Sequence, residues 1–173
     1  MSKAIRKPAP KSLPLPLSLA FMLVGLIIAS ASVTTSAFAG TCPADKVGAN
    51  PLADAPTMPV GVSESELASI DLSTENVKLK ERRLRLRHMI VQPGGMVPLH
   101  SHADRPALIM VNSGEIFENS SKCLVPILHK QGEISKEFLG TKHWWKNSTG
   151  KVVELTISDI VNDKKPDTMM EHM

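Results

Sequence analysis

Three histidines have the type and spacing that could hold a metal ion. His100 and His102 are separated by one residue, and His143 lies 41 residues further on, after a glycine turn. In an extended strand, residues i and i+2 leave the same face, so both imidazoles of the pair would point the same way. Three imidazole nitrogens bind a transition metal and leave positions open for water or substrate. The alternative is a set of histidines that only form hydrogen bonds, because a pair of this kind is common by chance.

Short strands must position these side chains. Residues 83–91 alternate basic and apolar side chains, which is typical of a half-buried strand, and Pro93, Gly94 and Gly95 are expected to end it. Turn residues separate further apolar runs at 107–112, 115–119, 124–129 and 152–160. Turns every 8–12 residues without a long helical period predict an all-β sandwich or barrel.

Two segments of this β region resemble the two cupin motifs. Gly94 to Gly114, which contains the H-x-H pair, has the spacing of the first motif, and Gly132 to Asn147, which contains His143, has the spacing of the second. The resemblance covers about 65–70 residues. It implies an RmlC-like double-stranded β-helix, or jelly-roll barrel. It also implies a divalent transition metal (Fe, Mn, Cu, Ni or Zn) held by His100, His102 and His143.

The sequence departs from the first motif at its metal ligand. Ala107 stands where the family has a glutamate, so the resemblance implies a neutral three-histidine site at most. Asp104 could supply a replacement oxygen, or it could belong to a turn with Arg105. Arg105 could also contact a substrate. Trp145 shares strand parity with His143, so it could wall the pocket, although packing in the core is the alternative.

Other polar residues have two readings each. Arg83, Arg85 and Arg87 share one strand face. They are expected either to meet solvent or acids on neighbouring strands, or to send one guanidinium into the pocket to hold a carboxylate substrate. A general acid or base would come from Glu118, Glu137, Asp104 or a histidine.

Residues 1–39 have the three parts of a secretory signal peptide. They carry four basic and no acidic residues, then an apolar run over 17–29, then Ala37-Phe38-Ala39. We therefore expect a periplasmic or secreted protein without a stable membrane span after cleavage. Residues 40–74 are expected to form a Pro-rich strap with a short helix at 63–70, residues 75–162 the barrel, and residues 163–173 a flexible tail.

Charge and cysteines limit the partners. Residues 40–173 carry 16 Lys and Arg against 17 Asp and Glu, which gives no electrostatic reason to expect nucleic acid. Export would allow Cys42 and Cys123 to form a disulfide. The alternative is that they are two unrelated free thiols.

Three functions of different class are therefore expected. The first is a metal-dependent oxygenase or isomerase that acts on a small molecule. The second is a metal-free cupin module that binds a small ligand or a sugar. The third is a structural or partner-binding cupin, such as a homodimer that pairs through an exposed barrel edge.

Overall fold

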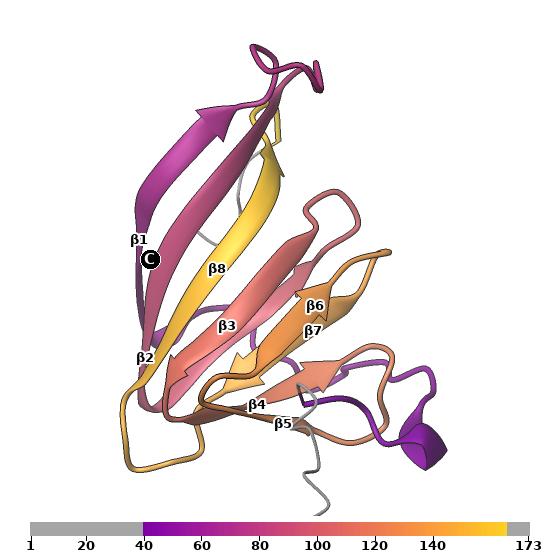
Figure 1. The fold of residues 1–173 in the computed structure, drawn as a ribbon. Coiled ribbons are helices and arrows are strands. Elements are labelled where there is room, and N and C mark those ends of the chain that lie inside the picture. Colours follow the sequence, from indigo (N-terminus) through magenta and orange to yellow (C-terminus); the bar gives the residue numbers. More distant parts are fainter. Residues whose placement is uncertain (1–39, 166–173) are drawn as a thin grey trace, which may run out of the picture. The chain divides into compact units, whose positions relative to one another are not determined.

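Strand β2 organises the fold because it takes part in two sheets (Figure 1). The computed structural model describes residues 40–165. Within β2 (Arg82–Ser101), residues 82–91 pair with β8 (Val153–Asn162), and residues 96–101 pair with β7 (Lys142–Lys146). Gly94 lies between the two pairings with a φ of 76°, which favours glycine. The strand end expected at residues 93–95 is therefore wrong: the chain bends there and continues into the other sheet.

The two sheets have the strand order of a jelly roll. The first contains β1 (Val60–Asp71), β2, β8, β3 (Ala107–Ser113) and β6 (Ile134–Glu137), in that order. The second contains the end of β2, then β7, β4 (Glu115–Ser120) and β5 (Ile127–Lys130). All these pairings are antiparallel. The predicted all-β jelly-roll barrel is confirmed by this order.

The interior of the barrel is apolar at one end and ionic at the other. Met89, Val91 and their neighbours across the barrel form the core. Further along the same face of β2, Arg85 and Arg87 are buried and bind Asp159 of β8 at 2.9–3.0 Å. For Arg85 and Arg87, the contacts therefore confirm the expectation that the arginines bind acids on neighbouring strands.

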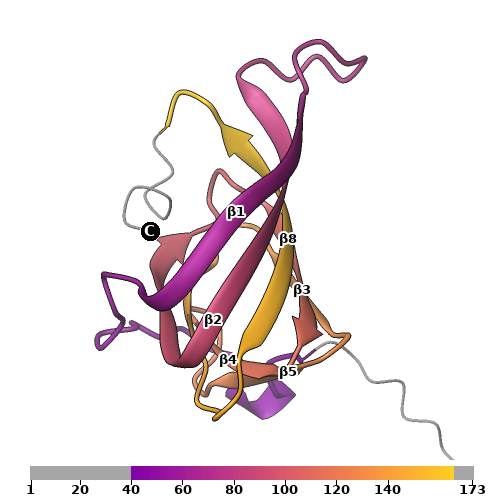
Figure 2. The same ribbon diagram turned by 90° about the vertical axis from the view of Figure 1, so that its left-hand side faces the viewer.

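Strand β1 replaces the short helix expected at residues 63–70, so that prediction is wrong. It runs antiparallel beside β2 (Figure 2). Its Val62 packs against the core, and its buried Glu64 meets Arg87 Nη1 at 2.5 and 2.6 Å. The short helix was expected because Ser63 and Glu66 have the Ser-x-x-Glu spacing of a helix capping box. A buried arginine needs a second carboxylate, and this tertiary ion pair outweighs the local capping pattern.

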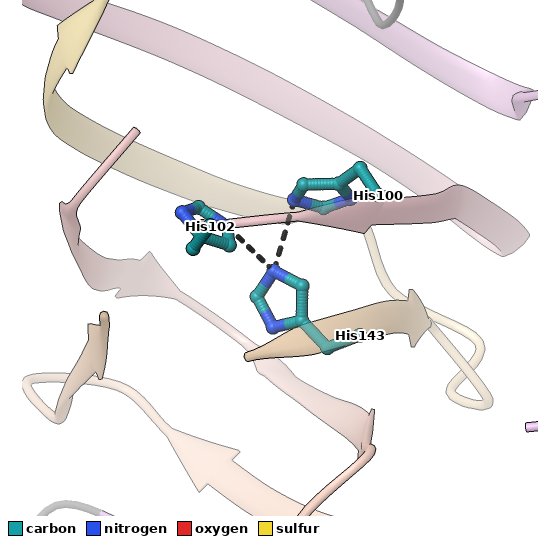
Figure 3. Close-up of side chains that lie close together, drawn as sticks. All are labelled: His100, His102 and His143. Carbon is teal, nitrogen blue, oxygen red and sulfur yellow. Dashed lines mark hydrogen bonds between the residues drawn. The ribbon is translucent and has the colours of Figure 1, made fainter. Parts of the chain in front are cut away.

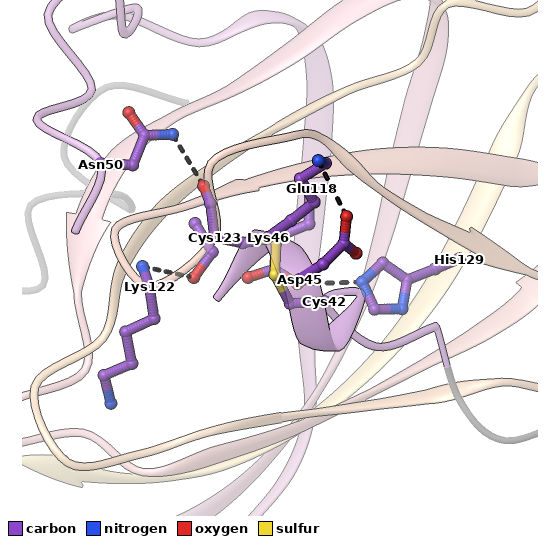
Figure 4. The surroundings of a disulfide bond; sticks show 9 residues. Cys42, Asp45, Lys46, Asn50, Glu118, Lys122, Cys123 and His129 are labelled. Carbon is purple, nitrogen blue, oxygen red and sulfur yellow. Dashed lines mark hydrogen bonds and ion pairs between the residues drawn. A yellow bond between two sulfur atoms is a disulfide. The ribbon is translucent and has the colours of Figure 1, made fainter. Parts of the chain in front are cut away.

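A disulfide ties the N-terminal strap to the barrel (Figure 4). Cys42 and Cys123 are bonded, which gives the predicted pairing. The strap contains a single 3₁₀ turn, η1 (Ala44–Lys46), and then a β-bridge between Val47 and Cys123. Asn50 adds a side-chain hydrogen bond to the carbonyl of Cys123 at 2.9 Å. The strap is therefore fixed to the loop between β4 and β5.

The predicted signal peptide at 1–39 and the end of the predicted tail, 166–173, lie outside the described residues. Within residues 40–165, no helix has the length and apolar character needed to cross a membrane.

Reducing the disulfide should destabilise the domain. The bond joins residues 81 apart, and a loop of that size corresponds to about 4 kcal/mol of unfolding free energy in the chain-entropy model. Urea denaturation with and without a reductant measures the difference. Cys42→Ser should lower the stability equally and make it insensitive to reductant. Two free thiols, found by non-reducing mass spectrometry in protein produced in an oxidising compartment, would contradict the bond.

Candidate metal centre

Three imidazole rings meet inside the barrel (Figure 3). His100 of β2 and His143 of β7 are directly paired across the second sheet, and His102 follows the end of β2. The Nε2 atom of His143 lies 2.9 Å from Nε2 of His100 and 2.9 Å from Nε2 of His102. His102 and His143 are buried, and His100 is half-buried. The structure thus brings together all three histidines that the sequence singled out.

Backbone carbonyls set the tautomers of the first two rings. His100 Nδ1 donates to the carbonyl of Pro98 at 2.9 Å, and His102 Nδ1 donates to that of Arg105 at 2.6 Å. A carbonyl oxygen only accepts, so the proton of each neutral ring is on Nδ1. The lone pairs on the Nε2 atoms therefore face the centre of the cluster.

Two buried glutamates hold the third ring. His143 Nδ1 lies 3.2 Å from Oε1 of Glu118 on β4 and 3.3 Å from Oε2 of Glu137 on β6. A protonated Nδ1 donates to these carboxylates, which leaves Nε2 for the centre. From the sequence, both glutamates were expected only as a general acid or base. An acid on the same strand face as the buried Ile116 was the signal for an inward Glu118.

The three rings differ in proton affinity. Burial lowers the pKa of His143, but Glu118 and Glu137 outweigh burial and raise that pKa to about 9. Burial, together with the nearby His143, lowers the pKa of His102 to about 4 and holds that of His100 well below its usual value. Without a metal, His143 is therefore an imidazolium, and the other two rings are neutral. The proton on His143 Nε2 then points at the Nε2 atoms of His100 and His102.

The spacing of the rings fits a metal ion. A metal with bonds of about 2.1 Å to two nitrogens at right angles holds those nitrogens about 3.0 Å apart. The Nε2 atom of His143 lies 2.9 Å from each of the other two Nε2 atoms, which matches this separation, and all three ligand atoms lie within 4.8 Å of one another.

The space beside the rings is small. A cavity of about 20 Å³ is bordered by His100, His102, Arg87, Trp145 and apolar core residues. It can hold about one water molecule. Trp145 is 2% exposed, packs in the apolar core and also borders this cavity, so it has both of the expected roles. Its Nε1 is 3.1 Å from His143 Nδ1.

The other predicted site residues lie beside the centre rather than in it. The carboxylate of Asp104 meets Arg82, Asn162 and Lys165, which hold its pKa below the usual range. Arg105 contributes its carbonyl to His102, and its guanidinium lies 3.9 Å from Asp159. Ala107 is buried next to Glu137 in the paired strands β3 and β6. Two buried acids are paired with Ala107 across strands, Glu137 of β6 and Asp159 of β8. Glu137 reaches the far side of His143, whereas Asp159 binds Arg85 and Arg87.

Comparison with known proteins finds similarity in structure only. No protein-family model matches the chain, and no curated protein matches it. A predicted oxalate decarboxylase from Thermotoga maritima is 17% identical, with 70% of this chain and 98% of that chain covered and a TM-score of 0.48. An RmlC-like cupin family protein with a double-stranded β-helix fold from Methanocaldococcus jannaschii is 18% identical. The match covers 49% of this chain and 75% of that chain, with a TM-score of 0.43.

A third solved structure is the CENP-C cupin domain of Drosophila melanogaster, which is 15% identical. The match covers 52% of this chain and 82% of that chain, with a TM-score of 0.40. Identities and TM-scores this low carry no argument about activity, substrate or partner. The strand order itself, with both motifs in place and their histidines in contact, gives the chain the cupin-type barrel that the motifs predicted.

Proposed function

We propose that this protein is an exported cupin-type metalloprotein that binds a divalent transition metal through His100, His102 and His143 and acts on or binds a small molecule. One observation carries the proposal: three Nε2 atoms, two of them from buried rings and one from a half-buried ring, converge with the spacing of metal ligands. Imidazole ligands suit Fe, Cu, Ni and Zn best and also occur with Mn.

A metal held by three neutral rings supplies a Lewis acid with open positions for water, dioxygen or a chelating substrate. The chain's own residues prepare that position. Glu118 fixes the ring of His143, the two carbonyls fix the other rings, and Trp145 closes the wall against bulk water. Arg87 brings a guanidinium to the same cavity.

The size of the cavity favours a ligand of one or two heavy atoms. Space for about one water suits water or dioxygen and does not hold a sugar. Among the predicted reactions, this observation favours oxygenase-like chemistry over an isomerase or a sugar-binding module.

The alternative is a metal-free barrel. The raised pKa of His143 supports it, because a proton on His143 Nε2 can donate to His100 or His102 and hold the rings together. In that case the barrel is a binding module for a small polar ligand, and no redox chemistry follows.

Export to the periplasm or the outside of the cell is part of the proposal. The disulfide between Cys42 and Cys123 supports it, since such bonds persist in oxidising compartments. A homodimer stays a prediction.

Removing one ligand ring should remove one metal ion. We expect His100→Ala or His102→Ala to lower the metal content of protein expressed in metal-rich medium by one equivalent per chain, because two rings bind far more weakly than three. Elemental analysis after dialysis measures the content. A metal at 100 times its dissociation constant also adds about 2.7 kcal/mol of stability, so chelation should lower the Tm of the wild type by several degrees.

The matched control is His88→Ala. His88 lies on the same strand as His100 but on the outside of the barrel near Glu154, so its loss should change neither the metal content nor the Tm shift. A wild type without stoichiometric metal, or an unchanged content in His100→Ala, would favour the metal-free alternative.

The metal-free protein should lose stability as the pH rises from about 6.5 to about 9. The folded pKa of His143 is about 9, above its usual value of 6.5, so folding binds a proton in this window. Its contribution is complete below pH 6.5, and it disappears above pH 9. The lowered pKa values of His100 and His102 act only below pH 6.5, where they reduce stability as the pH falls.

Urea denaturation in a chelator at several pH values measures this effect. The wild type should lose on the order of 3 kcal/mol relative to His143→Gln across the window. Parallel pH profiles for the two proteins would show that His143 does not carry the proton.

A further inference from the structure

The far side of the His143 ring carries a second set of metal-ligand atoms. Its Nδ1, Oε1 of Glu118 and Oε2 of Glu137 lie within 4.8 Å of one another, and all three residues are buried. The distances from Nδ1 to the two oxygens are 3.2 and 3.3 Å. A metal with bonds of about 2.1 Å spans such separations at ligand angles near 100°.

Charge gives this set a reason to take a cation. Glu118 and Glu137 are 3% and 2% exposed, so their charges need compensation inside the barrel. An imidazolium at His143 supplies one positive charge when no metal is bound. When His143 Nε2 binds the first metal, its ring is no longer an imidazolium. The positive charge beside the two carboxylates is then lost. His129 Nε2 lies 2.9 Å from Glu118, and the hydroxyl of Ser135 donates to Glu137.

Three polar groups converge on Nδ1 of His143. Two carboxylates face this atom as acceptors, and the N–H of Trp145 faces it as a donor at 3.1 Å. A proton or a metal ion on Nδ1 would compensate the two carboxylates, and either would take the lone pair that the Trp145 N–H faces.

A buried polar atom nearby is unsatisfied. His129 is 1% exposed, its Nε2 meets Glu118, and its Nδ1 has no hydrogen-bond partner among residues 40–165. A Cβ atom added at Gly40 would lie 3.0 Å from this Nδ1, so the free nitrogen faces the strap residue that borders the adjoining pocket. Unpartnered buried nitrogens of this kind mark sites where a ligand or water belongs.

That adjoining pocket provides room for the ion and its water ligands. It has a volume of about 230 Å³ and is lined by Glu118, Glu137, Ser135 and Thr141, with Gly40 and Cys42 of the strap at its edge. The three-histidine cavity has different lining residues, so the two spaces are separate. The His143 ring contacts lining residues of both, because its Nδ1 faces Glu118 and Glu137 and its Nε2 faces His100 and His102.

We infer that Glu118, Glu137 and Nδ1 of His143 bind a second divalent cation, so that the His143 ring bridges two metal ions. One nitrogen and two carboxylate oxygens, with water completing the shell, are a donor set that suits Zn²⁺. The proton on Nδ1 leaves as the second ion binds. The bridge between two metal ions rests on the proposed three-histidine site. The carboxylate site uses different ligand atoms, namely Nδ1 of His143 and the oxygens of Glu118 and Glu137, so it can bind a cation without the first metal.

Zinc stoichiometry tests the inference. The probe is Zn²⁺ added in excess to the exported, disulfide-bonded protein, with unbound metal removed by gel filtration and the remainder counted by elemental analysis. We expect two equivalents in the wild type, one in Glu137→Gln, one in His100→Ala and none in His143→Ala. Glu115→Gln, on the same strand as Glu118, is the matched control and should keep two.

Each outcome assigns a cause. One equivalent in the wild type, lost in His100→Ala and kept in Glu137→Gln, overturns the second site and leaves the proposed function standing. One equivalent that is lost in Glu137→Gln and kept in His100→Ala overturns the three-histidine site instead. No zinc in the wild type overturns both. The number of zinc equivalents in the wild type decides whether a second site exists, so a variant that fails to fold does not change that result. Circular dichroism shows whether each variant is folded. Glu118→Gln replaces Glu137→Gln if the latter does not fold.

Discussion

Three nitrogen lone pairs that face one another inside a barrel cannot remain without a cation between them. Carbonyls at Pro98 and Arg105 keep the protons of two rings on Nδ1, so the electron-rich Nε2 atoms must converge. At 2.9 Å, bare Nε2 lone pairs repel, and either a proton or a metal removes the repulsion. The surrounding structure can be understood as the means of holding these rings at that distance.

The bend in β2 does most of this positioning. The first half of the strand is committed to β8 by ten registered pairs, and the second half carries His100 to a position opposite His143 on β7. The buried ion pairs of Arg85 and Arg87 with Asp159 lock the register of the first half, because a one-residue slip would turn both guanidinium groups outward. An error in that register would therefore misplace the rings.

The sequence was most informative where the spacing of residues determines geometry. The H-x-H pair and the glycine spacing of both motifs resemble the cupin motifs, and that resemblance predicted the jelly-roll barrel and the meeting of the three histidines. Strand parity by itself predicted that His100 and His102 leave the same face. The sequence failed where long-range contacts decide. Val62 and Glu64 make a strand of residues that resemble a helix start, since their partners lie on β2. Glu118 and Glu137 come from β4 and β6, so no local pattern indicates that they meet at His143.

The alanine at position 107 changes where the negative charge lies. A carboxylate there would bind a metal in the three-histidine site directly, whereas the three histidines present are neutral ligands. Glu137, beside Ala107 in the neighbouring strand, and Glu118 place two carboxylates one imidazole ring away. Carboxylates that hold a ligand ring in this way orient and polarise it without themselves binding the metal. In the proposed site, alanine at position 107 would therefore leave room for a small ligand where a carboxylate would otherwise bind.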